Sequence, residues 1–395
     1  MSEWQKVKFL DVVHLNPRIS LEKGVEYPFV EMSNVVPCAR KPEKDVFKKY
    51  LGEGTKFEQG DTIVARIEPC LQNGKGFQCS YKQGFGSTEF LVFRPVNIND
   101  LDCDFLYYYM GQQSIREAMA KTMVGASGRQ RVNNKVFNDL QINLPPLSTQ
   151  HRIASILSRY DSLIENYQKQ IKLLEEAARR LYKEWFIDLR FPGHENTKII
   201  DGVPDRWERK KVNSIIELQS GFAFKSSTFD DNGAYKIVTI KNVKDGAFDG
   251  DNVSRIVAIP EKMPKHCVLA DGDILLSLTG NVGRVCIVNG KNYLLNQRVA
   301  KLATDYKAFA YCLFRSRDMF IEVNNLANGA AQQNVSPIRI GEMKILLPNN
   351  ELLQEFESIA RKSIARIISL QSQLRLLTEA RDRLLPKLMS GEIAI

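Results

Sequence analysis

The chain has 395 residues, more than one hydrophobic core usually organises, and 44% of them are hydrophobic and 26% charged, as in ordinary globular proteins. It has no run of eighteen apolar residues, and its first residues lack the apolar stretch of a signal peptide, which argues against a membrane or secreted protein. Lysine and arginine number 55 against 46 acidic residues, and the net charge of +9 favours a polyanionic partner such as nucleic acid.

The cysteine usage is that of a reducing compartment. The seven cysteines are odd in number and never form a Cys-x-x-Cys pair. This pattern argues against a disulfide framework and against a zinc knuckle. We therefore expect buried thiols and a cytoplasmic protein.

The chain repeats itself. Trp4 corresponds to Trp207, an offset of 203 residues, and the same offset carries Leu144 onto Leu347. Between these points the second copy has an insertion; strand-like residues 27–35 match residues 235–243, and Gly60-Asp61 matches Gly272-Asp273 before a β-branched run. A repeat of this length predicts two similar α/β domains.

Each copy ends in a long helical pattern whose apolar residues alternate in steps of three and four, the spacing of a coiled-coil seam. The predicted seam positions are Leu157, Ile164, Tyr167, Ile171, Leu174 and Leu181 in the first copy and Ile367, Leu370, Leu374, Leu377 and Leu384 in the second. Arg381 is the one breach of the second pattern. The alternative interpretation of such a seam is oligomerisation, but its duplication favours two helices of the same chain packed antiparallel as a spacer of about 58 Å.

These patterns predict an α+β fold: two similar α/β domains separated by two long antiparallel coiled-coil helices, in a pseudo-two-fold internal repeat. We expect a first domain at residues 1–147, a first helical region at 148–187, a linker at 188–206, a second domain at 207–350 and a second helical region at 351–391. Prolines followed by Ser148 or Asn349 supply the stop and N-cap signals that separate domain from helix.

No catalytic constellation is shared by the two copies. The offset turns His14 into Glu217 and His151 into Gln354. Residues 143–147 resemble the Asn-Pro-Pro-aromatic loop of amino methyltransferases but lack the aromatic residue, and the Glu-x-Lys of residues 342–344 has no lysine in its first-copy counterpart. A phosphate-binding glycine loop is also absent from the sequence. We expect a non-catalytic chain with no metal or cofactor of its own.

Three stretches without aspartate or glutamate, residues 121–138, 274–304 and 324–341, are the best candidates for nucleic-acid contact, because phosphate can approach them without repulsion. Arginine suits phosphate and guanine, and asparagine and glutamine suit adenine. The candidate DNA contacts are Arg129, Gln130, Arg131, Asn133, Arg284, Asn296, Gln297, Arg298, Gln332, Gln333 and Asn334. For any single one, a solvated loop explains the residue equally well, so the prediction concerns the clusters. Because the copies differ here while their frames agree, we expect an asymmetric, two-part DNA target.

Four segments resemble the specificity subunit of type I restriction-modification systems. They are residues 84–90 (GFGSTEF), 128–133 (GRQRVN), 144–153 (LPPLSTQHRI) and 384–391 (LLPKLMSG), and the similarity spans nearly the whole chain. The resemblance implies two target-recognition domains on double-stranded DNA and helical regions that contact two adenine-methylating modification subunits. It also implies a restriction subunit that translocates DNA. These partner subunits are expected to use S-adenosylmethionine, ATP and Mg²⁺.

Two other classes of protein stay open. One is a nuclease or methyltransferase with its own recognition domain, which activity of the isolated chain would favour. The other is a coiled-coil scaffold for proteins, which sequence-selective and salt-dependent DNA binding would dismiss.

Overall fold

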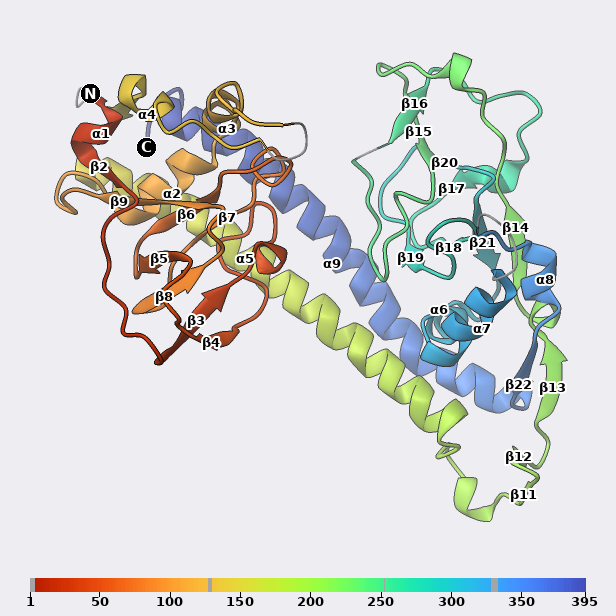
Figure 1. The fold of residues 1–395 in the computed structure, drawn as a ribbon. Helices are drawn as coiled ribbons and strands as arrows, with labels where there is room; N and C mark the ends of the chain where they lie inside the picture. Colours follow the sequence, from red (N-terminus) through yellow and green to blue (C-terminus); the bar gives the residue numbers. More distant parts are fainter. Residues whose placement is uncertain (1–3, 127–129, 252, 328–332) are drawn as a thin grey trace. The chain divides into compact units, whose positions relative to one another are not determined.

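The computed structural model describes residues 4–126, 130–251, 253–327 and 333–395 (Figure 1). The chain divides into two compact units: unit 1 comprises residues 1–165 and 376–395, and unit 2 comprises residues 166–375. Each unit has its own hydrophobic cores. Within the described ranges, no helix combines the length and apolarity that crossing a membrane requires.

Unit 1 contains two four-stranded sheets and one two-stranded sheet. The first, antiparallel sheet has the order β2 (Val13–Leu15), β9 (Phe90–Pro95), β6 (Thr62–Ala65) and β7 (Gly76–Gln78). The second has the order β4 (Phe47–Lys49), β3 (Glu26–Val30), β8 (Gln83–Gly86) and β5 (Thr55–Glu58), with β3 and β8 parallel. The third pairs β1 (Gln5–Lys8) with β10 (Gln141–Leu144). The short helices are α1 (Phe9–Val12), α2 (Cys103–Gly111), α3 (Gln113–Ala120) and α4 (Val136–Asp139).

Unit 2 repeats this topology element by element. Its antiparallel sheet has the order β14 (Glu217–Ser220), β21 (Val299–Ala303), β18 (Ile274–Ser277) and β19 (Val285–Ile287). Its second sheet has the order β16 (Ser254–Ile256), β15 (Tyr235–Val238), β20 (Tyr293–Leu295) and β17 (Val268–Leu269), with β15 and β20 parallel. The remaining elements are β13 (Glu208–Lys211) with β22 (Lys344–Leu347), the hairpin β11 (Ile199–Ile200) with β12 (Val203–Pro204), α6 (Lys307–Phe314), α7 (Arg317–Ala327) and α8 (Pro337–Gly341). The internal repeat predicted from the sequence is therefore confirmed.

The matched Gly-Asp pairs form the same turn in both units. Gly60 and Gly272 adopt left-handed φ angles of 90° and 82°, which glycine tolerates without steric cost. Each following aspartate is buried and accepts a backbone hydrogen bond: from Glu58 N to Asp61 Oδ2 (2.8 Å) and from Ala270 N to Asp273 Oδ2 (2.9 Å). Each aspartate is also paired with a cation, because a buried carboxylate needs a partner. Arg94 Nε lies 2.7 Å from Asp61, and Lys301 Nζ lies 2.9 Å from Asp273.

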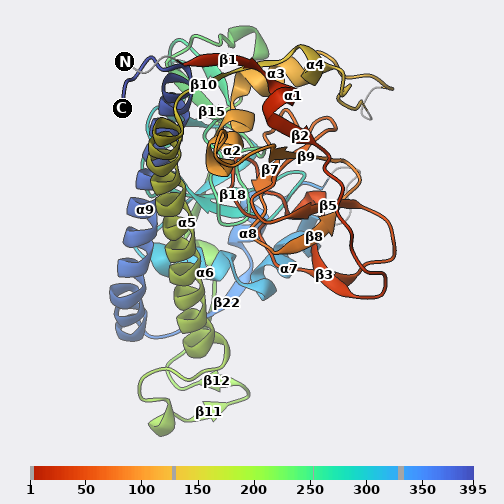
Figure 2. The same ribbon diagram turned by 90° about the vertical axis from the view of Figure 1, so that its left-hand side faces the viewer.

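Two long helices follow the sheets, α5 (Leu147–Tyr182, 36 residues) and α9 (Asn350–Ser390, 41 residues). The side chain of Asn349 caps α9 by accepting a hydrogen bond from Leu352 N (2.9 Å), and Gly391 follows α9 with a φ of 75°. Both helices contribute a segment to each unit, and within each unit the two segments lie side by side (Figures 1 and 2).

The direction of the helices follows from which ends pack together. In unit 1 the beginning of α5, through Ile153 and Leu157, shares a core with Leu388 near the end of α9. In unit 2 the end of α5, through Ala178, shares a core with Phe356 near the beginning of α9. The helices are therefore antiparallel, and the predicted fold class is confirmed.

The predicted seam positions are all at least half-buried. Leu157, Ile164, Ile367 and Leu370 are buried, and the half-buried positions are Tyr167, Ile171, Leu174, Leu181, Leu374, Leu377 and Leu384. Arg381, which interrupts the apolar pattern, forms a buried ion pair. Its Nη1 donates to Asp161 Oδ1 on α5 at 2.8 Å. The irregularity in the pattern therefore marks a polar contact between the helices of unit 1.

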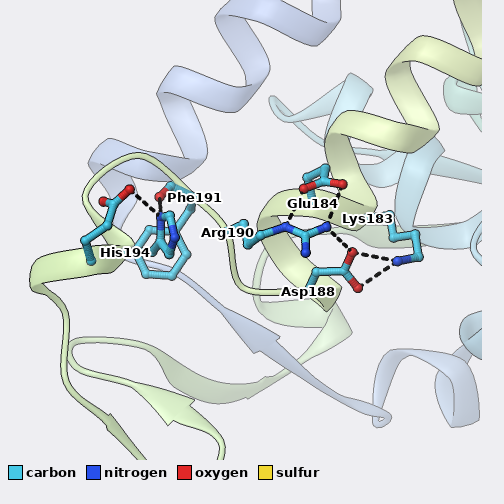
Figure 3. A network of polar contacts seen from close by, with 7 residues as sticks. Lys183, Glu184, Asp188, Arg190, Phe191 and His194 are labelled. Atoms are coloured by element: carbon cyan, nitrogen blue, oxygen red, sulfur yellow. Dashed lines mark hydrogen bonds and ion pairs between the residues drawn. The ribbon is translucent and has the colours of Figure 1, made fainter.

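The helix α5 ends in a π-helical turn, Lys183–Ile187, tied to the following connector by charged side chains (Figure 3). Arg190 donates from Nε and Nη2 to Glu184 at 2.6 and 2.8 Å and from Nη2 to Asp188 at 3.0 Å. Lys183 Nζ donates to both oxygens of Asp188 at 2.6 and 2.7 Å. Because these groups are exposed or half-buried, the network fixes the direction of the chain more than it stabilises the fold.

The prediction of buried thiols is only partly correct. All seven cysteines are free; Cys79, Cys267, Cys286 and Cys312 are buried, whereas Cys70 and Cys103 are half-buried. Cys38 is exposed, because it lies in a turn with a φ of 56° rather than in a strand or helix. Composition could not separate a thiol in a loop from one in a core.

Candidate nucleic-acid interface

In unit 2 three loops that carry predicted contact residues meet at one end of the antiparallel sheet. We name residues 278–284, 296–298 and 333–335 loop cluster 2. Leu278, just after β18, donates from its N to Arg298 O (3.0 Å) and accepts at its O from Val335 N (3.0 Å). Thr279 and Asn334 form a β-bridge, and Gly280 N donates to Gln333 O (3.0 Å). Two of the acid-free stretches, far apart in the sequence, therefore form one surface.

Most predicted side chains of loop cluster 2 are accessible. Gln297, Arg298, Gln333 and Asn334 are exposed, and Arg284 and Asn296 are half-buried. Within the described part of the chain, Arg284 and Arg298 form no ion pair, so both guanidinium groups can bind an external anion. Thr279 Oγ1 donates to Asn334 Oδ1 (2.9 Å), and the amide group of this exposed side chain has two further hydrogens to donate. Gln332 lies outside the described residues.

Arg284 also lines an open hollow of about 660 Å³ in unit 2. Lys241 and Lys244 line the same hollow, together with Asn281 and three aspartates, Asp231, Asp249 and Asp251. The search for acid-free stretches did not find these two lysines, because they follow β15 in a segment that also contains aspartates. Only the fold brings them close to Arg284.

Unit 1 builds the corresponding surface with the same backbone connections. We name residues 66–68, 87–89 and 130–133 loop cluster 1. Val132 N donates to Arg66 O (2.9 Å), and Glu68 N donates to Gln130 O (3.3 Å). Arg131 forms β-bridges with both Ile67 and Val124. By the offset of 203, Arg131 occupies the position of Asn334. Arg129 lies outside the described residues.

Loop cluster 1 contains two acidic residues, Glu68 and Glu89, that the sequence did not single out. Arg131 Nε donates to Glu89 Oε2 and Oε1 at 2.8 and 3.1 Å, and its Nη2 donates to Oε1 at 2.5 Å. The hydrogen bonds from Arg131 lower the pKa of Glu89 below its ordinary value, with a further contribution from Arg66. Gln130 and Asn133 are half-buried beside this pair, and Asn133 Oδ1 accepts from Lys135 N (3.1 Å) as a local turn.

The strand register shows which residue of unit 2 matches Glu89. Ala65 pairs with Phe90 in unit 1, and Ser277 pairs with Val299 in unit 2. The residues just before these partners, Glu89 and Arg298, therefore occupy equivalent positions. No signal in the sequence reveals this, because insertions change the offset between the copies in this region.

Each unit also holds the helices through an equivalent tyrosine. In unit 1, Tyr108 OH on α2 donates to Asp161 Oδ2 at 2.6 Å. In unit 2, Tyr311 OH on α6 donates to Glu175 Oε1 at 2.6 Å, and Arg315 lies 3.5 Å from the same carboxylate. Burial and the neighbouring carboxylates raise the pKa of both tyrosines, so both stay protonated donors. The segments of α5 are therefore anchored to α2 and α6 by hydrogen bonds as well as by apolar packing.

The described residues contain no group of three or more histidine, cysteine, aspartate or glutamate side chains placed to hold a metal ion. What the geometry does present is two loop surfaces on equivalent sheets that carry arginine, asparagine and glutamine, with Glu89 paired to Arg131 in unit 1. Such side chains suit hydrogen bonding to phosphates and base edges.

Comparison with known proteins gives one consistent result. A family model described as the type I restriction modification DNA specificity domain matches residues 1–176 and 204–375. The MjaVIII specificity subunit of a type I restriction enzyme from Methanocaldococcus jannaschii is 30% identical over 314 residues, 75% of this chain and 71% of the relative. The HindI specificity subunit from Haemophilus influenzae is 22% identical and aligned over 100% of both chains.

A solved structure has a similar fold. The S subunit of a type I restriction-modification system from M. genitalium superimposes with a TM-score of 0.57 and 18% sequence identity, covering 98% of this chain and 96% of that one. The family model matches both halves of the chain, in agreement with the repeated fold of the two units. The chain belongs to the type I restriction-modification DNA specificity family.

Proposed function

We propose that the chain is the non-catalytic specificity subunit of a type I restriction-modification complex and binds an asymmetric, two-part DNA site. The observation that carries this proposal is the pair of loop clusters: the same backbone connections present Arg131 beside Glu89 in unit 1 and Asn334 beside Arg298 in unit 2. A shared frame with different side chains suits the recognition of two different half-sites. The positively charged chain supplies the sequence-independent part of the affinity.

The two helices suit the role of a spacer. A continuous helix of 36 residues, the length of α5, extends about 54 Å, which exceeds the turn of a DNA duplex at about 34–36 Å. In this proposal the lengths of α5 and α9 set the number of base pairs between the half-sites. Deleting matched helical turns from both helices would shorten the gap in the recognised sequence by a few base pairs.

The exposed surfaces of the two helices also suit the binding of two copies of one partner. Leu173 on α5 and Leu376 on α9 are equivalent by the offset of 203, and their exposed fractions are 64% and 55%. Each is preceded by a basic residue, Lys172 or Arg375, and each is followed three positions later by a glutamate. In this proposal the repeated surfaces bind two modification subunits, and a restriction subunit joins that assembly. These partners would supply S-adenosylmethionine, ATP and Mg²⁺ chemistry, and the chain itself would bind none of these cofactors.

The proposal is tested by assembling the chain with its modification subunits and mapping methylated adenines in DNA exposed to the complex. We expect a gapped motif whose two halves differ, and sequence-selective binding that weakens steeply as salt rises. Methylation or cleavage by the isolated chain would instead favour an enzyme. An assembled complex without sequence preference would favour a protein scaffold.

A further inference from the structure

We propose that Arg131, held in place by Glu89, recognises a guanine in the half-site bound by unit 1. This inference rests on the proposed function and assigns a base and a positioning residue within it. It starts from the Arg131–Glu89 pair, whose two side chains differ in exposure: 53% for Arg131 and 20% for Glu89. The carboxylate is the inner member of the pair, and the guanidinium is the outer one.

The backbone of Arg131 is fixed on both sides. Its N donates to Val124 O and its O accepts from Val124 N, both at 3.0 Å, and Ile67 bridges it from the opposite side. The backbone of Glu89 is also fixed, because its O accepts from Arg66 N at 2.9 Å and its N donates to Ser87 Oγ at 3.2 Å. Such preorganisation reduces the entropy lost when a side chain binds a ligand.

The geometry of the pair leaves one edge of the guanidinium available. Glu89 takes the hydrogens on the Nε and Nη2 side of Arg131. The five hydrogens of a guanidinium lie in one plane, so the end formed by Nη1 and Nη2 keeps parallel donors pointing away from Glu89. Two parallel donors match O6 and N7 of guanine in the major groove, whereas adenine presents one acceptor and one donor there.

The neighbouring charges favour a base over a phosphate. The carboxylate of Glu89 lies against the guanidinium, and its lowered pKa keeps it ionised at neutral pH. A phosphate that approached Arg131 would meet this negative charge, whereas the edge of guanine carries no net charge. Arg66 Nη2 donates to Val132 O at 3.4 Å, and the Arg66 charge also lowers the pKa of Glu89. By contrast, Arg298, which occupies in unit 2 the position that Glu89 has in unit 1, has no carboxylate partner among the described residues, as suits a phosphate contact.

The experiment uses the assembled methyltransferase complex and maps its methylated motif with Arg131→Lys and with Glu89→Gln. Lysine keeps the charge but loses the two-pronged donor, so discrimination against adenine at one guanine of one half-site should fall roughly 10- to 100-fold. Glu89→Gln should relax the same position by a smaller factor, because the guanidinium is then less firmly held. The other half-site should stay unchanged in both variants.

The matched control is the Arg190–Glu184 pair, which has the same side-on geometry at the end of α5 (Figure 3). Arg190→Lys and Glu184→Gln should leave both half-sites unchanged. If Arg131→Lys leaves the motif intact and lowers the affinity for all sequences equally, Arg131 contacts phosphate and the inference is wrong. It is equally wrong if nothing changes or if neither half-site contains guanine. A wild-type complex without any sequence preference would instead overturn the proposed function.

Discussion

The two units share their frame and differ in the charge of their loops. The buried aspartates after the glycine turns, the strand orders and the tyrosines that meet α5 recur in both. At the loop ends, Glu89 faces Arg131 in unit 1 where Arg298 and Asn334 stand in unit 2. Backbone connections and buried polar groups are therefore common to both surfaces, whereas the outward side chains differ.

The helix anchors differ in a second way. Unit 1 buries an ion pair between its two helix segments, Arg381 with Asp161, and Tyr108 donates to the same aspartate. Unit 2 has no such pair at the equivalent positions, which are Ala178 and Ile364 by the offset. Apolar packing between α5 and α9 therefore has a larger share in unit 2 than in unit 1.

Removal of the buried ion pair in unit 1 tests this contrast between the helix anchors and should change stability most. Arg381→Ala leaves Asp161 buried without its cation and should cost about 3–5 kcal/mol of folding free energy. Replacing both Arg381 and Asp161 with leucine, together with Tyr108→Phe to remove the hydroxyl that loses its acceptor, should restore much of that loss, because well-packed apolar groups can substitute for a buried ion pair. Urea unfolding of the chain measures both effects. A loss below about 1 kcal/mol in Arg381→Ala would show that the ion pair adds little to unit 1.

The next effect would test whether the repeat extends to partner binding. Leu173→Glu and Leu376→Glu should each remove one modification subunit from the assembly, and the double variant should remove both. Each exposed leucine, once buried by a partner, contributes about 2 kcal/mol, enough to lower the affinity roughly 30-fold. Native mass spectrometry gives the subunit ratio directly. Leu163→Glu on α5, which changes an exposed leucine without an equivalent leucine in α9, is the matched control.

The sequence was sufficient to predict features that depend on local periodicity. The long helices, their seam and the repeated Gly-Asp turn follow from residue spacing within one segment. Asp161 could not be assigned to Arg381, because 220 residues separate them. Glu89 was missed for a related reason: it corresponds to Arg298 at an offset of 209 rather than 203, and only the strand register shows this equivalence.

A third prediction concerns the backbone N–H groups at the start of α2 in unit 1 and of α6 in unit 2, which donate to different kinds of side chain. In unit 1 the neutral Gln150 accepts from Asp102 N at 2.9 Å, whereas in unit 2 Glu357 accepts from Ala308 N and Phe309 N at 3.0 and 3.1 Å. Glu357→Ala should cost about 2 kcal/mol of folding free energy, because the buried donors lose their acceptor. Glu357→Gln should cost much less, since the amide oxygen still accepts.

The pH dependence sharpens that prediction. Burial raises the pKa of Glu357 above its ordinary value of 4.5. The folded state therefore binds this proton more tightly than the unfolded state, and the wild type loses stability as the pH rises through this range. The stability of Glu357→Gln relative to the wild type should then be greatest at neutral pH and decline toward pH 4.5. A constant difference across pH, measured by thermal unfolding, would contradict the assignment.

The smallest expected effect concerns the charge contrast between the loop clusters. Arg298→Gln in loop cluster 2 removes a cation that forms no ion pair with the described residues. It should weaken DNA binding by the assembled complex by about tenfold at moderate salt, for all sequences alike, and reduce the salt dependence by about one counterion. Lys198→Gln, an exposed cation of the connector outside both loop clusters and outside the acid-free stretches, controls for the loss of net charge alone. A base-specific effect of Arg298→Gln would mean that both loop clusters use arginine to recognise a base. An arginine would then need no carboxylate partner such as Glu89 to contact a base instead of a phosphate.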